Sequence, residues 1–289
     1  MIADADQGLR PTLSGISIGE AWRVAGQRIG RLDARLLIEH VARCTHAELI
    51  AAPSRVLTPE QVAQLSELVL SRANGWPVAY LVGRTGFYGS EFVVTPAVLV
   101  PRPETELLVE RALAATRGAV EPRIVDLGTG CGAIAVTLAR LRPEARLTAV
   151  DLSPAALAVA RANGERHGVA LRLFQGDWYA PLTGERFDLI VANPPYVASD
   201  DPHLQGDGVR REPRMALTDG VAGGDGLASI RRIVSGAAAH LLPAGGLLIE
   251  HGYNQAAAVR SLLVEAGFVD VASWRDLAGI ERASGGRLD

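Results

Sequence analysis

The sequence has 289 residues, of which 48% are hydrophobic and 21% are charged, a balance that fits a globular protein with one large and one small domain. Its formal net charge of −3 and pI of about 6.1 disfavour nucleic acid as the main partner, because free-standing nucleic-acid binders are usually basic. The chain contains no lysine, which excludes phosphate-loop nucleotide hydrolases and lysine-dependent carbonyl chemistry.

The N-terminal segment MIADADQGLR is acidic and polar, so it does not have the character of a signal peptide. No apolar run reaches the length of about 20 residues that a membrane-spanning helix needs. The two cysteines, Cys44 and Cys131, match neither a disulfide framework nor a zinc site, and reduced thiols are the simplest interpretation. These features predict a soluble cytoplasmic protein that has no membrane partner.

Residues 1–84 are predicted to form a small helical domain. Apolar residues recur at helical spacing over residues 16–28 and 32–44. Two further helix starts follow, one at the Thr45–Glu48 capping box and one at Thr58, which can cap a helix whose first residue is a proline. Because no strand is predicted in this region, the helices are expected to pack as a bundle.

Residues 85–289 are predicted to form a second, larger domain that begins with a connector. Residues 87–94 have the pattern of a short β-hairpin, and three prolines between residues 96 and 103 then interrupt regular structure. A helix is expected to follow from Thr105 through Leu113.

From residue 123 onward, apolar segments of strand length alternate with segments that have helical periodicity. The predicted strands are residues 123–127, 146–150, 171–175, 187–192, 246–250, 268–274 and 280–288. The predicted helices between them are residues 133–141, 154–167, 227–242 and 255–266. The alternation predicts an α/β fold, a Rossmann-like, seven-stranded, mostly parallel sheet with helices on both faces, whose last two strands form an antiparallel pair.

A glycine-rich loop follows the first of these strands and precedes a helix. Its residues are Gly128, Thr129, Gly130, Cys131 and Gly132. Glycines allow the backbone to approach a ligand closely, and ligands of such sheets bind outside the carboxyl ends of the strands. Asp151 ends the second strand and can accept hydrogen bonds from both ribose hydroxyls, while Trp178 follows the third strand and offers a face for a purine. The pattern permits S-adenosylmethionine, a nicotinamide cofactor, or a tight turn that binds no ligand.

The fourth strand runs into the segment Asn193, Pro194, Pro195 and Tyr196. Because prolines have no N–H, this segment presents backbone acceptors and few donors, and the Asn193 side-chain carbonyl adds another acceptor. Such a surface suits a substrate that donates hydrogen bonds, such as an –NH2 group, and the Tyr196 ring can pack against a planar group. A proline turn that only ends the strand is the alternative without a ligand.

Two acceptors suit methyl transfer to an amide nitrogen, which is a poor nucleophile because its lone pair is shared with the carbonyl. The Asn193 Oδ1 atom and the Pro194 carbonyl can draw the N–H groups out of the amide plane, so that the lone pair can attack a methyl sulfonium. Positive charge grows on the nitrogen as the methyl group arrives, and the two dipoles then stabilise the transition state more than the ground state. No strong base is needed before the attack.

Together these motifs resemble class I S-adenosylmethionine methyltransferases that act on planar nitrogens, and more closely the release-factor glutamine N5-methyltransferases of the HemK/PrmC type. The resemblance covers nearly the whole chain. The segments that carry it are Asp126–Gly132, Asp151, Gly176–Trp178 and Asn193–Tyr196, together with Pro77–Leu81, Gly86–Gly89, Val100–Glu106, Glu212–Leu217 and Glu250–Gly252. The C-terminal segment Glu281–Arg287 departs from the pattern, but it contains none of the site residues.

The resemblance implies that the chain transfers a methyl group from S-adenosylmethionine to the glutamine of the Gly-Gly-Gln motif in peptide-chain release factors. It assigns binding of the glutamine to residues 193–196, and binding of the cofactor to residues 128–132, Asp151, Trp178 and Asn193. It further implies that the helical N-terminal domain helps to hold the release factor. We expect a monomer without a stable nucleic-acid partner.

Several other polar residues have simpler interpretations. Arg102 and Glu104 either order the cofactor or the substrate loop, or form an exposed salt bridge, which would contribute little. His251 is expected to be structural or solvated. Cys131 is expected to be a small filler, because no base with triad-like spacing lies beside it. The acids and the histidine of residues 199–214 match no metal-binding pattern and predict a solvated, substrate-facing loop, so no metal is expected.

Three other functions remain compatible with the sequence. An adenine-N6 DNA methyltransferase would present an exocyclic amine with the same donors to residues 193–196, although such an enzyme must flip its base and hold phosphates. A nicotinamide-dependent oxidoreductase is permitted by the glycine loop but gives residues 193–196 no role. A cofactor-sensing or protein-binding module on a methyltransferase scaffold would bind the cofactor without transferring its methyl group.

Overall fold

The structure is a computed structural model that describes residues 15–289. These residues divide into two compact units. One unit contains the residues up to Gly83 together with Gly206–Arg211, and the other contains Arg84–Gln205 and Glu212–Asp289. The acidic N-terminal segment that is predicted not to be a signal peptide lies outside the described residues. Within the described part, no helix combines the length and the apolar character that crossing a membrane requires.

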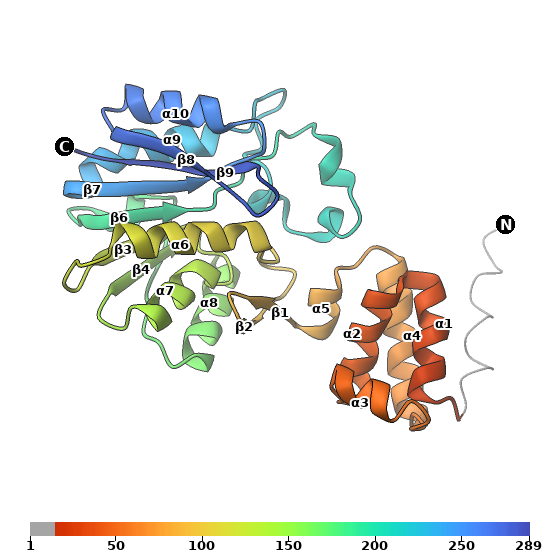
Figure 1. Ribbon diagram of the computed structural model, residues 1–289. Coiled ribbons are helices and arrows are strands. Elements are labelled where there is room, and N and C mark those ends of the chain that lie inside the picture. The colour runs from red at the N-terminus through yellow and green to blue at the C-terminus, as the bar shows by residue number, and fades with distance from the viewer. Residues whose placement is uncertain (1–14) are drawn as a thin grey trace. The chain divides into compact units, whose positions relative to one another are not determined.

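The first unit is a bundle of short helices (Figure 1). Its α-helices are α1 (Ile18–Ile29), α2 (Arg31–Ala42), α3 (His46–Ala51), α4 (Pro59–Ala73) and α5 (Val78–Val82). Two helix starts are capped as predicted, because Thr45 and Thr58 each accept a hydrogen bond from the backbone N–H three residues further on. The Glu48 and Gln61 side chains in turn accept a bond from the cap backbone. Apolar residues of α1, α2 and α4 form the core, which confirms the predicted helical bundle.

Segment Gly206–Arg211 belongs to this helical unit, although in sequence it lies between two strands of the sheet. Arg72 of α4 makes an ion pair with Asp207 at 2.5 Å. The guanidinium of Arg211 lies over the Trp76 ring, 5.2 Å from its centroid. A solvated loop is expected here from the sequence. The attachment could not be predicted, because the partners are far apart in sequence, Arg72 and Asp207 by 135 positions.

The second unit begins with the predicted hairpin of β1 (Arg84–Phe87) and β2 (Ser90–Val93) and then forms a seven-stranded sheet. The strand order of the sheet is β5-β4-β3-β6-β7-β9-β8. Its strands are β3 (Arg123–Leu127), β4 (Arg146–Asp151), β5 (Arg172–Gln175), β6 (Phe187–Ala192), β7 (Leu241–Glu250), β8 (Val269–Arg275) and β9 (Glu281–Arg287). Within this sheet β9 runs antiparallel to both of its neighbours, β7 and β8, and the other neighbouring strands pair in parallel. The predicted α/β fold with a mostly parallel sheet is therefore confirmed.

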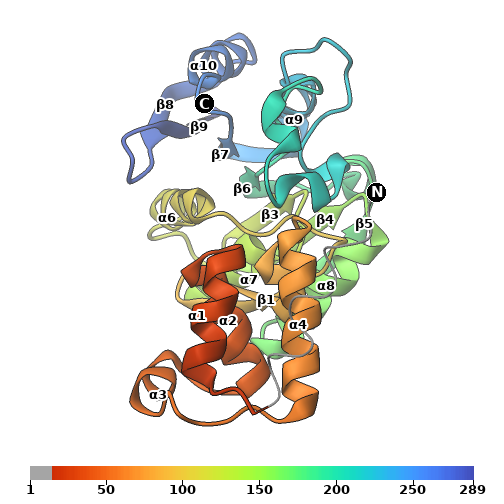
Figure 2. The same ribbon diagram turned by 90° about the vertical axis from the view of Figure 1, so that its right-hand side faces the viewer.

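Helices cover both faces of the sheet (Figures 1 and 2). The helices α6 (Glu106–Ala115), α7 (Ala133–Leu141) and α8 (Pro154–Arg166) lie on one face, and α9 (Ala228–His240) and α10 (Ala256–Glu265) lie on the other. Ile190 of the central strand β6 packs in one cluster with Ile233 of α9 and Leu263 of α10, and all three are fully buried. Each such side chain contributes about 1.5–3 kcal/mol when it is removed from water.

Strand β7 differs from its predicted bounds. It begins at Leu241 rather than at residue 246, because α9 ends at His240 and Leu241 already pairs with Phe187 of β6. The register then shifts, and regular pairing resumes where Leu189 faces Gly246. The sequence pattern shows only the regular part, because the residues within the irregularity do not alternate as a strand does.

The C-terminal segment Glu281–Arg287, which departs from the family pattern, forms strand β9. A Cβ atom at Gly285 would lie 2.4 Å from the carbonyl oxygen of Leu247 in β7. Since real Cβ atoms do not approach a carbonyl so closely, a glycine is required at this point of the sheet. The departure is thus a feature of strand packing, and no residue of the segment lines the pocket described below.

Candidate active site

A pocket lies at the carboxyl ends of β3, β4 and β6. The strand order reverses between β3 and β6, which are neighbours in the sheet although β4 and β5 separate them in sequence. Leu127, the last residue of β3, pairs with Ala192, the last residue of β6. The glycine loop and the segment Asn193–Tyr196 therefore leave the sheet side by side. This is the position at which open α/β sheets bind their ligands.

The glycine loop needs its glycines for conformation and for space. Gly128, Gly130 and Gly132 have positive φ angles of 76°, 56° and 82°, a region that residues with a Cβ rarely adopt. A Cβ at Gly128 would lie 3.3 Å from the Trp178 ring, and a Cβ at Gly132 would lie 3.2 Å from the Cβ of Ala160 in α8. The first glycine thus leaves room for the aromatic wall of the pocket, and the last lets α7 begin close to α8.

Asp151 at the end of β4 is tied to the glycine loop. Its carboxylate accepts hydrogen bonds from the backbone N–H groups of Gly130 and Ser153, each at 2.8 Å. Burial raises the pKa of Asp151 above its ordinary value, although these hydrogen bonds act in the opposite direction. The two bonds hold the carboxylate in one orientation. Its remaining lone pairs can accept from a ligand that carries paired hydroxyls.

Trp178 lines the pocket from the segment that follows β5. Its φ angle is 51°, which is uncommon for a residue with a bulky side chain and places local strain at the pocket. This conformation brings the ring against Gly128. An aromatic face, a fixed carboxylate and an open glycine backbone together fit the adenosine part of S-adenosylmethionine, so the residues present suit the cofactor that the sequence implies.

The structure brings most of the sequence-predicted site residues together. The pocket is lined by Gly128, Thr129, Gly130, Cys131, Asp151, Trp178, Asn193 and Pro195. Three predicted residues, Gly132, Pro194 and Tyr196, do not line it. Gly132 precedes α7, and Pro194 is buried. The Tyr196 hydroxyl donates a hydrogen bond to Glu250 at 3.2 Å, so this side chain is directed at the end of β7.

Asn193 is held by Thr105, the residue just before α6. The Asn193 Nδ2 atom donates a hydrogen bond to Thr105 Oγ1 at 3.1 Å, and both residues line the pocket. Because the amide nitrogen is engaged, the Asn193 Oδ1 atom is left as an acceptor for a ligand. Gln255 fixes the far end of the same segment, since its Nε2 atom donates to the Tyr196 carbonyl at 3.0 Å.

Part of the pocket wall comes from two segments that are not predicted as site residues from the sequence. These are Ala97, Val98, Leu99, Pro101 and Thr105 before α6, and Met215 and Ala216 between β6 and α9. Both segments overlap motifs that carry the family resemblance, and this overlap is the one feature of the sequence that could have indicated their place at the pocket. Their place at the pocket depends on packing between distant parts of the chain, which spacing alone does not reveal.

An ion pair between Arg102 and Glu212 joins these two segments. The Glu212 side chain is only 2% exposed, and its Oε2 atom also accepts a hydrogen bond from the Val100 N–H at 3.1 Å. Arg102 therefore pairs with Glu212 rather than with Glu104. The Arg102 side chain is 34% exposed and the Glu212 side chain is buried, so the ion pair connects the two wall segments of the pocket in a largely buried setting.

Replacing Glu212 with alanine is expected to lower the free energy of unfolding by about 2 kcal/mol, because the Arg102 guanidinium and the Val100 N–H lose their acceptor in a largely buried setting. Affinity for S-adenosylmethionine should also fall, since both segments line the pocket. Thermal unfolding and calorimetric titration measure the two effects. The matched control is Glu144→Ala, which removes an exposed carboxylate that pairs with Arg142 outside the pocket and should change neither quantity. Unchanged stability and affinity in Glu212→Ala would contradict the fastening role.

Asp126 of β3 is fully buried beneath the glycine loop. Its Oδ2 atom accepts a hydrogen bond from Thr129 Oγ1 at 2.7 Å, but burial dominates and raises the pKa of Asp126 from 3.8 to about 7. A carboxyl whose pKa is higher in the folded state destabilises the fold when it is ionised. This effect is absent below the unfolded pKa of 3.8, grows between 3.8 and 7, and is fully present at higher pH.

The isosteric variant Asp126→Asn is therefore expected to have a higher Tm than the wild type at about pH 8 and no such advantage at about pH 4. Asparagine keeps an acceptor for the Thr129 hydroxyl and has no charge to bury. Differential scanning calorimetry across this pH range measures the difference. An equal shift at both pH values would show that ionisation of Asp126 is not its cause.

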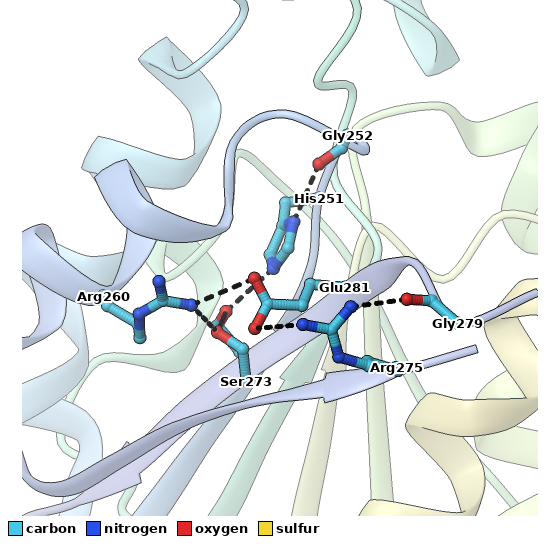
Figure 3. Close-up of polar contacts among 8 residues, drawn as sticks. His251, Gly252, Arg260, Ser273, Arg275, Gly279 and Glu281 are labelled. Carbon is cyan, nitrogen blue, oxygen red and sulfur yellow. Dashed lines mark hydrogen bonds and ion pairs between the residues drawn. The ribbon is translucent and has the colours of Figure 1, made fainter.

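Two other residues have the structural roles that the sequence predicts. His251 is fully buried, and its Nε2 and Nδ1 atoms lie 2.8 Å from Ser284 Oγ and 3.0 Å from the Gly252 carbonyl oxygen (Figure 3). Burial also lowers its pKa, which favours the neutral ring. Cys131 lines the pocket, but burial raises the pKa of its thiol to about 12, so it remains a protonated filler.

Comparison with known families and structures agrees with this architecture. The family model of the PrmC N-terminal domain matches residues 22–83, and that of the Methyltransferase small domain matches residues 103–206. A methyltransferase from Pyrococcus furiosus has a TM-score of 0.52 over 77% of this chain and 96% of that chain, at 18% identity. A 16S rRNA methyltransferase of T. thermophilus has a TM-score of 0.53 over 71% of this chain and 50% of that chain, at 20% identity. These two structures support the fold.

Sequence relatives of higher identity are release factor glutamine methyltransferases. That of Burkholderia pseudomallei is 53% identical over 264 residues, which cover 89% of this chain and 92% of the relative. That of Bordetella pertussis is 50% identical over 266 residues, which cover 92% of this chain and 97% of the relative. That of Escherichia coli is 43% identical over 259 residues, with 89% and 92% covered. The chain therefore belongs to the family of release factor glutamine methyltransferases.

Proposed function

We propose that this chain methylates the side-chain amide nitrogen (N5) of the glutamine in the Gly-Gly-Gln motif of peptide-chain release factors. S-adenosylmethionine is the methyl donor and supplies an electrophilic methyl group on a positively charged sulfur. The observation that carries the proposal is the position of Asn193 beside the glycine loop, since Ala192 and Leu127 are paired residues. The names of the relatives that are about half identical to this chain support the same substrate.

The segment that begins with Asn193 prepares the amide for attack. Asn193 Oδ1 is available as an acceptor because Nδ2 already donates to Thr105. The carbonyl of Pro194 is the next acceptor along the chain. The two acceptors hold the two N–H groups of the substrate amide and favour the geometry in which its lone pair is released. Orientation of this kind contributes up to about 7–11 kcal/mol in favourable cases.

The proton leaves the nitrogen after the methyl group has arrived. Two ionisable groups near the segment do not act as bases beforehand, because burial raises the pKa of the Tyr196 hydroxyl and of the Cys131 thiol well above neutrality. Both groups are therefore protonated in the neutral range. The reaction depends on oriented acceptors that stabilise positive charge on the nitrogen, rather than on prior removal of a proton.

In this proposal the cofactor is bound by the loop residues 128–132, by the Asp151 carboxylate through the ribose hydroxyls, and by the Trp178 ring through the purine. Asn193 contacts both the cofactor and the substrate, and residues 193–196 receive the glutamine. Residues 1–84 bind the release factor outside its Gly-Gly-Gln motif, and residues 85–289 carry out the transfer. The protein acts as a cytoplasmic monomer and needs no stable nucleic-acid partner.

The test is incubation of the full chain with an unmodified release factor and S-adenosylmethionine, followed by mass spectrometry of the Gly-Gly-Gln peptide. We expect a gain of one methyl group on the glutamine, and no gain when that glutamine of the release factor is changed to alanine. Transfer to duplex DNA would instead favour the adenine-N6 DNA methyltransferase, and oxidation of NADH the oxidoreductase. Cofactor binding without transfer to either substrate would favour the binding module.

A further inference from the structure

Large apolar side chains that are exposed to solvent are unevenly distributed over the second unit, all of which the structure describes. Some lie where the chain approaches the amino ends of the strands, namely Val120, Leu141 and Val264. The others follow the carboxyl ends of β4, β6, β7 and β8, and these are Leu152, Met215, Val221, Tyr253, Leu277 and Ile280. A single exposed apolar residue is ordinary, but a group at one edge of a sheet is typical of a surface that a partner covers.

The turn between β8 and β9 stands at the same edge of the sheet as the pocket (Figure 1). Strand β9 is antiparallel to β7 and to β8, so β8 runs in the same direction as β7 and ends at the same edge. Ala283 of β9 pairs with Glu250, the last residue of β7, and the residues before Ala283 therefore lie beyond the end of β7. Two strand spacings separate β9 from β6, which is about 10 Å. The turn is thus close to Asn193, the residue that follows β6.

Polar bonds hold this turn in one conformation. Asp276 Oδ1 accepts hydrogen bonds from the N–H groups of Ala278 and Ile280, each at 2.9 Å. The Asp276 N–H in turn donates to the Ile280 carbonyl at 2.8 Å. Arg275 donates to the Gly279 carbonyl at 2.6 Å, as Figure 3 shows. All of these partners lie within the turn or next to it, so the turn is ordered by its own bonds.

Leu277 at the tip of the turn has no part in these bonds. Its side chain is fully exposed, and Ile280 on the other side of the turn is exposed to a lesser degree. An apolar side chain that stays in water does not stabilise the fold, whereas its burial under a partner is favourable. A turn that is already ordered also loses little conformational freedom when it binds. The turn therefore presents Leu277 in a form that suits binding.

Tyr253 extends this apolar surface toward the end of β7. It is more than half exposed and lies two residues after His251. The His251 N–H donates to the Arg282 carbonyl at 2.9 Å, which holds the beginning of this segment against β9. Figure 3 shows that Arg260 of α10 also pairs with Glu281 of β9, at 3.4 Å. The base of the turn is therefore fixed to the body of the second unit.

A protein substrate is the partner that must reach this edge. A glutamine that enters the pocket arrives at the carboxyl ends of β3, β4 and β6, and the rest of its protein stays outside. A typical protein interface covers about 800 Å² on each partner, which is roughly 30 Å across. An interface of this size around the glutamine also covers the turn about 10 Å away. Met215 makes the surface continuous with the site, because it is exposed and also lines the pocket.

We propose that Tyr253, Leu277 and Ile280 form a docking surface for the release factor and contact the part of it that surrounds the Gly-Gly-Gln motif. This inference rests on the proposed function. It gives the unit that carries the active site an attachment of its own to the substrate protein, besides the one proposed for residues 1–84. None of the three residues lines the pocket, so they contribute to KM for the release factor and leave the chemical step unchanged.

The first test compares Leu277→Ser with the wild type in the release factor assay. We expect KM for the release factor to rise by at least about 10-fold, while kcat at saturating release factor and Kd for S-adenosylmethionine change by less than about threefold. Because Leu277 is fully exposed, Tm should be that of the wild type. The matched control is Val120→Ser, which removes an almost fully exposed apolar side chain before β3, at the opposite edge of the sheet. It should leave all four quantities unchanged.

The second test asks whether the fixed turn matters. In Asp276→Ala the N–H groups of Ala278 and Ile280 lose their acceptor, while the apolar side chains of the turn are still present. We expect KM for the release factor to rise at unchanged kcat, because the turn must then be ordered when it binds. Asp276→Asn keeps an acceptor for the two N–H groups and should restore most of the affinity. A wild-type KM in Asp276→Ala would overturn the role of the fixed turn.

The third test is direct cross-linking of the full chain to the release factor. A photo-reactive benzoylphenylalanine is placed at position 277 or at position 120, and the cross-linked peptides are identified by mass spectrometry. We expect release factor peptides from position 277 and none from position 120. Cross-links from position 277 to a second copy of this chain alone would overturn the proposal, as would a KM within threefold of the wild type in Leu277→Ser, or an equal rise of KM in Val120→Ser. A wild type that leaves the release factor unmethylated would instead refute the proposed function, and this inference with it.

Discussion

Asn193→Ala should lower kcat for release factor methylation by about 10²- to 10³-fold, the usual effect of removing one group that stabilises developing charge. The variant loses the Oδ1 acceptor, and it also loses the bond from Nδ2 to Thr105 that orients the side chain. The affinity for S-adenosylmethionine should change by less than about threefold, because the glycine loop and Asp151 are intact. Single-turnover kinetics with saturating cofactor measure the chemical step, and calorimetry measures the binding.

The matched control for this variant is Asn254→Ala, which removes the same side chain at an exposed position outside the pocket. It should be as active as the wild type. Asn193→Asp is a second comparison, since it keeps an acceptor at the site but cannot donate to Thr105, and it should be intermediate or inactive rather than normal. A wild-type rate in Asn193→Ala would mean that the acceptor pair does not drive the transfer.

The elements of the fold can be predicted from the sequence because their signals are local. The Thr45 and Thr58 capping boxes contain donor and acceptor within four residues, and both form as predicted. The central strands β3, β4 and β6 read as apolar runs because a parallel sheet with helices on both faces buries nearly all of their residues. Irregular pairing has no such signal, which explains why the start of β7 at Leu241 is missed while its regular end at Glu250 is predicted.

The sequence could predict which residues lie close together in the candidate site, because their proximity follows from the topology of the sheet. Parallel strands bring their carboxyl ends to one edge, so residues that follow Leu127, Asp151 and Ala192 meet without any knowledge of side-chain packing. Side-chain direction is different, because it depends on partners. Tyr196 is expected from sequence to face a planar substrate, yet its hydroxyl bonds to Glu250, 54 positions away in the chain.

The residues that hold the site's side chains in place could not be predicted from the sequence. Thr105 is 88 positions from Asn193, and Arg102 is 110 positions from Glu212. Each of these residues has a plausible local interpretation, as a helix start or as an exposed charge, and nothing in the spacing selects the other interpretation. Their roles follow from tertiary packing, which brings the connector before α6 against the ends of β6 and β7.

Asp151→Ala should weaken cofactor binding and leave the chemical step nearly unchanged, whereas Asn193→Ala should slow the chemical step and leave cofactor binding nearly unchanged. The variant loses the carboxylate that accepts hydrogen bonds from paired hydroxyls, and bonds to a charged acceptor contribute about 1.5–3 kcal/mol each. Loss of one such bond should raise the Kd for S-adenosylmethionine by about 10- to 100-fold, and loss of both should raise it further. At saturating cofactor, kcat should stay within about threefold of the wild type, because Asn193 and Thr105 are unchanged.

Alanine also leaves the N–H groups of Gly130 and Ser153 without their acceptor, and the loosened loop is a second cause of weaker affinity. The variant Asp151→Asn distinguishes the two causes. Asparagine keeps one acceptor for the loop but carries no charge. Because burial raises the pKa of Asp151, the affinity of the wild type should weaken on acidification as the carboxylate is protonated, whereas that of Asp151→Asn should not. Calorimetric titrations over a pH series measure both. Wild-type affinity in Asp151→Ala, or an unchanged pH dependence of affinity in Asp151→Asn, would contradict the role of Asp151 in binding the cofactor.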